Sequence, residues 1–341
     1  MALWVLQAVR PYASTTMLLS SNRVSTSSAS TNSAHTHQGS AQVPSRLNQL
    51  SYRATQSLVY PLADWRRQLA QRSQPQEIIN QKELRVVGMR RTGNHAIITW
   101  IERQQPGTTY HLNNVAAGTN PYRYKSNNLR RYHPQHGKMA AVYQRQAAGE
   151  LIKRDCLILS YEDWGLEQVT QPRFERNRTL YLGKSAQQLD VLILRDPFNL
   201  FASRLKQNFV ETKSKTASMV DMWLAYAREF AGESGYLQPD RVCINYNRWF
   251  ADVNYRRELA DQLGLVFSDA GLRHVPSLGG GSSFSGTRHS GQAGCLDVTN
   301  RWRHFADNPA FRQLFQNEEI WHYSTQIFGD FPDTDTLRPA S

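Results

Sequence analysis

The chain has 341 residues, enough for one large domain or two small ones with a full core. Its 40 lysines and arginines exceed its 28 acidic residues by 12, and 32 of these cations are arginine, which suits anionic ligands such as nucleotides, nucleic acid or acidic polysaccharide. Three cysteines are too few for a disulfide framework and favour a reducing compartment. No apolar run is long enough to cross a bilayer, and 40% hydrophobic residues exclude a wholly disordered chain.

The N-terminal region differs in composition from the rest. Residues 1–63 contain no acidic residue, four arginines and twelve serines. Because the serine-rich stretch has neither helical nor strand periodicity, residues 1–80 are predicted to be a disordered extension, with one short helix within 47–72. This composition is typical of an organellar transit peptide, and equally of a tail without function. The protein is therefore predicted to be soluble, in the cytoplasm or inside an organelle.

The folded domain is predicted to cover residues 83–330, where short apolar runs alternate with helical patterns. The runs predicted as strands buried on both faces are 84–89, 156–161, 191–194 and 242–246. The predicted helices are 96–101, 198–209, 216–231, 253–263, 298–305 and 309–328. This alternation predicts an α/β fold with a central parallel sheet flanked by helices.

The segment Leu84–Ile101 has the order strand, polar loop with glycine, helix. In this order, unpaired backbone N–H groups and the helix dipole can meet an anion. Gly93 lets the backbone approach the ligand, Arg91 supplies charge and Thr92 supplies a hydroxyl donor. The alternative interpretation is an ordinary tight turn with surface arginines.

This loop is not a Walker A motif. Gly88 and Gly93 are followed by Asn94 and His95, whereas that motif requires lysine and then serine or threonine. An ordinary ATPase or GTPase is therefore disfavoured, and the loop suggests phosphate recognition without a metal ion.

A second predicted strand, at 191–194, also ends in a basic residue, Arg195. Pro197 follows where the first turn of a helix tolerates proline, and Ser203 lies eight residues after Arg195. The arginine and the serine could hold a second phosphate. Alternatively, Asp196 caps the helix and pairs with Arg195.

Together and in this order, the two segments resemble the donor-binding loops of the sulfotransferases that use 3′-phosphoadenosine 5′-phosphosulfate (PAPS). Arg90–His95 is similar to the loop that binds the 5′-phosphosulfate, and Arg195 with Ser203 is similar to the segment that binds the 3′-phosphate. Tyr246 resembles the tyrosine that reaches the adenine, and Arg301-Trp302 belongs to a stretch similar to the C-terminal helices. The resemblance implies donor contacts from Arg90, Arg91, Thr92, Gly93, Asn94, His95, Arg195, Ser203, Tyr246 and Arg288.

The sequence departs from the family pattern at three places. Arg91 stands where the cytosolic members have lysine, and Tyr246-Asn247 replaces the usual Tyr-Glu. The Arg-Lys-Gly segment that closes over the donor has no clear counterpart. Gly279–Arg288 lies at about that position, where Arg288 is a candidate and a flexible linker is the alternative.

The acceptor of a sulfuryl group must lose a proton to a base. Glu162 and Asp163 follow the strand 156–161 at its carboxyl end, where ligands bind in open α/β sheets. The resemblance implies a glutamate or histidine base at this stage of the fold, so Glu162 is predicted as the base, although it could instead cap the next turn. The further candidates are Asp163, His111, His133 and His136. Arg91 and His95 are predicted to stabilise the transferring group, although His95 could be an ordinary first-turn residue.

The resemblance thus implies a P-loop NTPase-like three-layer sandwich that transfers a sulfuryl group from PAPS to a hydroxyl or amine of a small molecule or glycan. No metal is expected, since the ten histidines show no ligand spacing. The alternatives are a metal-dependent small-molecule kinase and a basic nucleic-acid-binding protein, the latter being disfavoured. Residues 102–155 and 164–190 are predicted to build the acceptor cleft.

Overall fold

The structure is a computed structural model that describes residues 59–71, 77–214, 216–275, 281–284, 286, 288, 291–292, 294 and 296–338. The chain separates into two compact units, residues 1–66 and 67–341. The disorder predicted for residues 1–58 lies outside the described residues. The short helix predicted within 47–72 is present as α2 (Tyr60–Gln71), in which Leu62, Trp65 and Leu69 follow a helical spacing.

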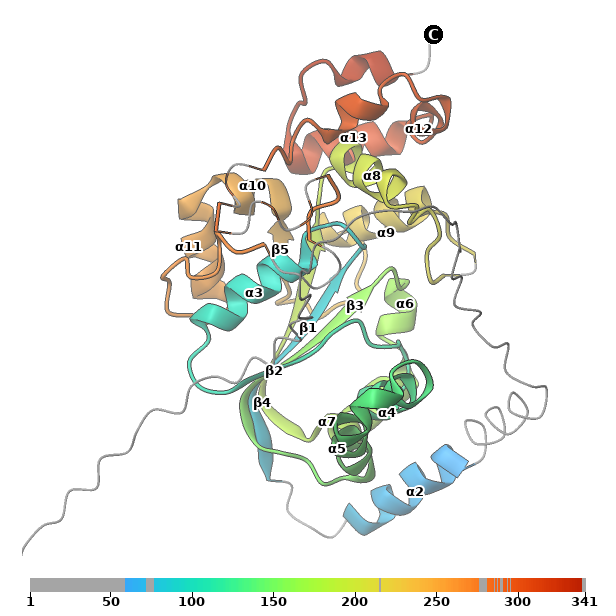
Figure 1. The fold of residues 1–341 in the computed structure, drawn as a ribbon, viewed down its shortest axis with the longest axis vertical. Helices are drawn as coiled ribbons and strands as arrows, with labels where there is room; N and C mark the ends of the chain where they lie inside the picture. The colour runs from blue at the N-terminus through green and yellow to red at the C-terminus, as the bar shows by residue number, and fades with distance from the viewer. Residues whose placement is uncertain are drawn as a thin grey trace, which may run out of the picture. The chain divides into compact units, whose positions relative to one another are not determined.

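Five parallel strands form one sheet in the order β2-β3-β1-β4-β5 (Figure 1). Their bounds are β1 (Ile78–Gly88), β2 (Thr109–Leu112), β3 (Arg154–Glu162), β4 (Lys184–Leu194) and β5 (Val242–Asn245). The four predicted strands are all present, and the parallel sheet is confirmed. β2 is the strand that the sequence did not predict, because only one of its four residues is buried.

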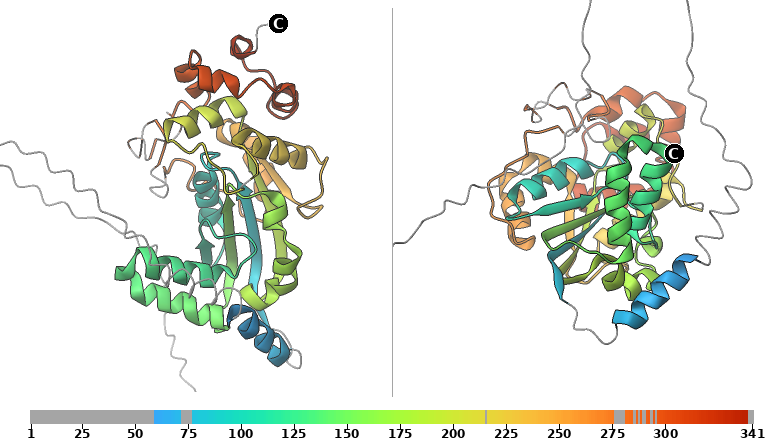
Figure 2. Two further views of the ribbon diagram at one scale, coloured as in Figure 1. Left: turned by 90° about the vertical axis from the view of Figure 1, so that its right-hand side faces the viewer. Right: turned by 60° about the horizontal axis from the view of Figure 1, so that its bottom comes forward.

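Helices cover both faces of the sheet (Figures 1 and 2). One face carries α3 (Asn94–Gln104), α10 (Tyr246–Ala251) and α11 (Val253–Gln262). The other carries α4 (Pro121–Tyr132), α5 (Gly137–Ala148), α6 (Leu166–Val169), α7 (Pro172–Leu182), α8 (Pro197–Lys206) and α9 (Met219–Phe230). The C-terminal elements η5 (Arg301–Phe305), α12 (Pro309–Gln313), α13 (Glu318–Phe328) and η6 (Thr334–Leu337) pack on the layer of α8 and α9, and η2 (Pro134–His136) joins α4 to α5. The three-layer α/β sandwich is thereby confirmed.

Successive residues of the central strands feed two separate cores. In β1, Leu84 and Val86 pack under α3 and α11, whereas Val87 packs toward α8 and α9. In β4, Val191 and Ile193 share the first core, whereas Leu192 and Leu194 share the second. Both faces of the central strands are buried against helices, which explains why these strands appear in the sequence as short apolar runs.

The C-terminal helix predicted over 309–328 is divided in two. Asn308 caps α12 through its side chain, which accepts a hydrogen bond from Phe311 N, and Asn317 caps α13 in the same way from Glu319 N. A second cap within the predicted helix starts a new helix, because the side chain satisfies the N–H groups that a continuous helix would bond internally. Within the described ranges, no helix is long and apolar enough to cross a membrane.

Candidate active site

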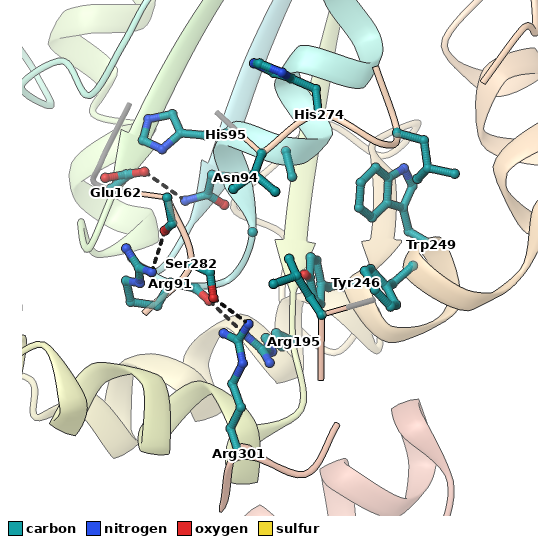
Figure 3. Close-up of a pocket in the computed structure, with 17 residues that line it drawn as sticks. Arg91, Asn94, His95, Glu162, Arg195, Tyr246, Trp249, His274, Ser282 and Arg301 are labelled. Carbon is teal, nitrogen blue, oxygen red and sulfur yellow. Dashed lines mark hydrogen bonds between the residues drawn. The ribbon is translucent and has the colours of Figure 1, made fainter. Parts of the chain in front are cut away.

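A cleft opens at the carboxyl end of the sheet, where the segments that follow β1, β3, β4 and β5 meet (Figure 3). Glu162 ends β3, Arg195 follows β4, and Tyr246 follows β5. One end of the cleft is polar and the other is apolar. The remaining lining residues are Arg91, Gly93, Asn94, His95, Ala96, Trp249, Phe250, Leu272, His274, Val275, Gly281, Ser282, Leu296 and Arg301.

The loop between β1 and α3 has a backbone that ordinary residues rarely adopt. Gly93 has φ +102°, and a Cβ at this position would lie 2.1 Å from Cε2 of Tyr246. Glycine is therefore required both by the backbone and by the tyrosine ring that packs against it. Arg91 has φ 72°, a left-handed conformation that costs a non-glycine residue energy and is often found in binding loops. The first turn of α3, beginning at Asn94, borders the cleft, and the carbonyl of Gly93 accepts hydrogen bonds from Ala96 N at 3.0 Å and Ile97 N at 3.1 Å.

The start of this loop is held by a buried carboxylate, Asp163. Its Oδ1 accepts hydrogen bonds from Arg90 N at 2.9 Å and from Arg204 Nη1 at 2.6 Å. Its Oδ2 lies 3.0 Å from Arg90 Nε in an ion pair. Arg90 does not line the cleft, and its guanidinium is paired with Asp163.

Thr92 is also placed differently from the prediction. Its side chain is fully buried, and its hydroxyl donates to Met89 O at 2.6 Å. The Thr92 backbone N–H donates to the same carbonyl at 3.2 Å. Thr92 therefore closes the turn of the loop and does not present its hydroxyl to the cleft.

Arg195 crosses the floor of the cleft over the ring of Tyr246, with its guanidinium carbon 5.0 Å from the ring centroid. It donates to Arg91 O at 3.3 Å and to Val298 O. Its Nε lies 3.9 Å from Oδ2 of Asp196. Arg195 therefore lines the cleft and also pairs with Asp196, as the alternative interpretation of this segment expected.

Asp196 explains one departure from the family pattern. Its Oδ1 accepts a hydrogen bond from Asn199 N at 2.7 Å and so caps α8. Its Oδ2 accepts from Asn247 Nδ2 at 2.9 Å, and burial raises the pKa of this carboxyl group. A glutamate in place of Asn247 would bring a second carboxylate to the same buried position, whereas the amide donates a hydrogen bond.

Arg301 is a cleft residue that the sequence analysis did not propose as a donor contact. It reaches the cleft from η5, where Nη1 donates to Ser203 Oγ at 3.1 Å and Nη2 donates to Ser282 Oγ at 3.2 Å. Ser203 is fully buried, does not line the cleft and accepts the hydrogen bond from Arg301, so it orients this guanidinium. Arg288 is exposed and is not among the residues that line the cleft, whereas Arg301 is. The resemblance of Arg301-Trp302 to a family stretch was the available signal.

The three arginines of the cleft repel one another. Burial lowers the pKa of Arg301 to about 9, helped by the charges of Arg195 and Arg91. Burial and Arg195 also lower the pKa of Arg91. Side chains whose charge is opposed by their surroundings, gathered in one cleft, are typical of functional sites, and a bound anion would relieve their repulsion.

The polar end contains Glu162. Its Oε1 accepts from Asn94 Nδ2 at 3.2 Å, and Asn94 Nδ2 also donates to Met89 O at 3.1 Å. Beside them, His95 Nε2 lies 3.0 Å from Asn113 Oδ1. Figure 3 shows Glu162, Asn94 and His95 grouped at this end.

Of the five predicted bases, Glu162 is the one that lines the cleft. Asp163 is paired with two arginines. His111 is bonded to Ser160 Oγ at 3.0 Å, and burial lowers its pKa to about 3. His133 precedes η2 and His136 is its last residue, and neither lines the cleft.

Aromatic and aliphatic side chains form the apolar end. The rings of Tyr246 and Trp249 have centroids 5.9 Å apart, and Phe250 lies 6.2 Å from the tyrosine. The sequence analysis missed Trp249 and Phe250, although they follow the predicted tyrosine on one short helix. This surface suits a flat heterocycle. In the part of the chain that the structure describes, no group of three or more histidine, cysteine, aspartate or glutamate residues could hold a metal ion.

No protein-family profile matches the chain, and no curated protein sequence is similar to it. Among solved structures, the sulfotransferase domain of the Synechococcus PCC 7002 olefin synthase is 14% identical with a TM-score of 0.39, covering 76% of this chain and 98% of that domain. Mouse sulfotransferase SULT7A1 complexed with PAP is 11% identical with a TM-score of 0.40, covering 84% of this chain and 94% of that one. At this level of similarity, a functional conclusion depends on the residues of the cleft.

Proposed function

We propose that the protein is a sulfotransferase that moves a sulfuryl group from PAPS to a hydroxyl or amine. The observation that carries this proposal is the convergence of Arg91, Arg195 and Arg301 on one cleft beside the ring of Tyr246. They come from three separate segments, and their mutual repulsion is relieved by an anion bearing several charges. PAPS combines such charges with an adenine ring.

The two ends of the cleft suggest how the donor is oriented. The adenine fits the apolar end, against Tyr246 and Trp249. Arg195 and Arg301 would then hold the 3′-phosphate, and the loop at Gly93 with Arg91 would hold the 5′-phosphosulfate. The sulfuryl group would face the polar end. This order follows that of the sequence resemblance, with Arg301 as the additional contact.

The reaction is an in-line displacement at sulfur. The acceptor oxygen or nitrogen bonds to sulfur, the bond from sulfur to the bridging oxygen breaks, and its electron pair stays on the phosphate of the leaving nucleotide. Glu162 takes the acceptor proton, and its hydrogen bond from Asn94 holds the carboxylate in place. Arg91 stabilises the charge that develops on the bridging oxygen. His95 lies where it can donate to the sulfuryl oxygens.

The test is a thermal-shift titration of the full chain with 3′-phosphoadenosine 5′-phosphate (PAP), with ATP and magnesium, and with RNA. We expect PAP to stabilise the protein by about 3–4 kcal/mol at 100–1,000 times its Kd. Transfer of labelled sulfate from PAPS to an acceptor panel then establishes the reaction. Stabilisation by ATP only with magnesium would favour the kinase alternative. RNA binding that weakens steeply with salt would favour the nucleic-acid-binding alternative.

A further inference from the structure

Two lysines approach Glu162 from elements outside the donor cleft. Lys125 lies on α4 and Lys213 follows α8, and the charge of each interacts with that of Glu162. Both residues are half-buried. Lys213 donates to Asn114 Oδ1 and lies over the ring of Trp164, with Nζ 5.1 Å from the centroid. Neither lysine lines the donor cleft, and the backbone N–H of Lys213 donates to the carbonyl of Asp163, the residue after Glu162, at 2.9 Å.

The charges around these lysines do not balance. Asp163 is already paired with Arg90 and Arg204, and Glu162 also interacts with Arg91. Within the described ranges, Lys125 has no hydrogen bond or ion pair. Burial lowers the pKa of Lys125 and of Lys213 to about 8. Two partly desolvated ammonium groups that share one carboxylate, Glu162, with Arg91 are costly, and a bound anion lowers that cost.

The sequence around α4 reinforces the imbalance. Between Glu102 and Glu150 there is no acidic residue, so no carboxylate of the α4–α5 hairpin can pair with Lys125. The hairpin also exposes further cations, namely Arg130, Arg131, Lys138 and Arg145. Its net charge attracts anions toward the lysines.

We infer that the acceptor carries an anionic group, a carboxylate, sulfate or phosphate, next to the hydroxyl or amine that receives the sulfuryl group, and that Lys125 and Lys213 bind it. This inference rests on the proposed function. The anion places the acceptor atom beside Glu162, so the lysines act as specificity residues. An acidic glycan and a small aromatic acid both offer this chemistry, and matched probes separate them.

The experiment uses the full chain, with and without saturating PAP, in calorimetric titrations with two matched pairs of probes. One pair is an oligosaccharide containing hexuronate and its carboxyl-reduced counterpart. The other is 4-hydroxyphenylacetate and its amide. We expect the acid of one pair to bind at least tenfold more tightly than its neutral partner, and that pair identifies the kind of acceptor. Lys125→Met and Lys213→Met should each reduce this preference about tenfold with an unchanged Kd for PAP. Lys138→Met, on the exposed surface of the same hairpin, should leave the preference unchanged.

The pH dependence of the native chain gives a readout that needs no variant. The charged and titratable groups that face the two lysines are Glu162, Asp163, Arg90 and His111. The imidazole of His111, with a pKa of about 3, stays neutral between pH 7 and 9, whereas the lysines lose their charge as the pH rises through about 8. Affinity for the acid should therefore fall over this range, and affinity for the neutral partner should not.

Several outcomes overturn the inference and leave the proposed function standing. These are binding of PAP without binding of either acid, equal binding of acid and neutral partner, and lysine variants that keep the full preference. Failure of PAP to bind overturns the proposed function instead. The titrations without PAP then still decide whether the two lysines select an anion.

Discussion

Replacement of Arg301 by methionine tests whether this residue is part of the donor site. The guanidinium is buried, bonded to Ser203 and Ser282, and opposed by Arg195 and Arg91, which with burial lower its pKa from 12.5 to about 9. At about 1.36 kcal/mol per pKa unit, this shift corresponds to about 5 kcal/mol, and because burial is its largest cause, a bound phosphate would recover only part of it. A charge-assisted hydrogen bond in proteins contributes about 1.5–3 kcal/mol, and we take this lower range. Arg301→Met should therefore weaken PAP binding by about 10- to 150-fold.

The assay is calorimetric titration of the variant with PAP and with adenosine 5′-phosphate, which lacks the 3′-phosphate. Because Arg301 is proposed to hold the 3′-phosphate, affinity for adenosine 5′-phosphate should change less than threefold. Arg303→Met is the matched control, since Arg303 is exposed and pairs with Asp333 at 2.6 Å. Equal losses for both nucleotides, or PAP affinity as in the native protein, would refute this placement of Arg301. Thermal melting of each variant shows whether the fold is retained.

Three further substitutions test other parts of the cleft. Arg195→Ala should weaken PAP by about 1.5–3 kcal/mol, and adenosine 5′-phosphosulfate much less, in competition titrations; equal losses would mean that Arg195 does not contact the 3′-phosphate. Arg91→Ala should lower kcat by a few powers of ten, on the order of 3–5 kcal/mol, with a smaller effect on PAP affinity. Arg91→Lys should keep substantial activity. Near-normal turnover of Arg91→Ala would show that this loop does not bind the phosphosulfate. Gly93→Ala should lower the free energy of unfolding by about 1–3 kcal/mol and weaken PAP binding, because the new Cβ would lie 2.1 Å from the ring of Tyr246. Thermal melting and titration with PAP measure the two effects. Gly137→Ala, with open space around the new Cβ, is the control.

Local sequence patterns were sufficient to predict the main elements of the fold and the end of the sheet at which the cleft lies. The apolar runs that became β1, β3, β4 and β5 are recognisable because burial on both faces removes polar residues from a strand. The order of strand, polar loop and helix also placed Gly93 and Arg195 at the carboxyl end of the sheet, since parallel strands end at one edge. By contrast, β2 and the hairpin of α4 and α5 are too polar for such patterns.

The roles of individual side chains depended on partners far away in the chain. Arg90 resembles a donor-binding residue in sequence, but Asp163, 73 residues later, takes its charge. Arg301 enters the cleft because Ser203, 98 residues earlier, binds its guanidinium. Ion pairs and hydrogen bonds form between groups a few ångströms apart in space, and the local sequence does not show which distant residue supplies the partner. The sequence by itself therefore determined where the cleft lies, whereas the tertiary structure decided which arginines remain available to an anion and which are already neutralised.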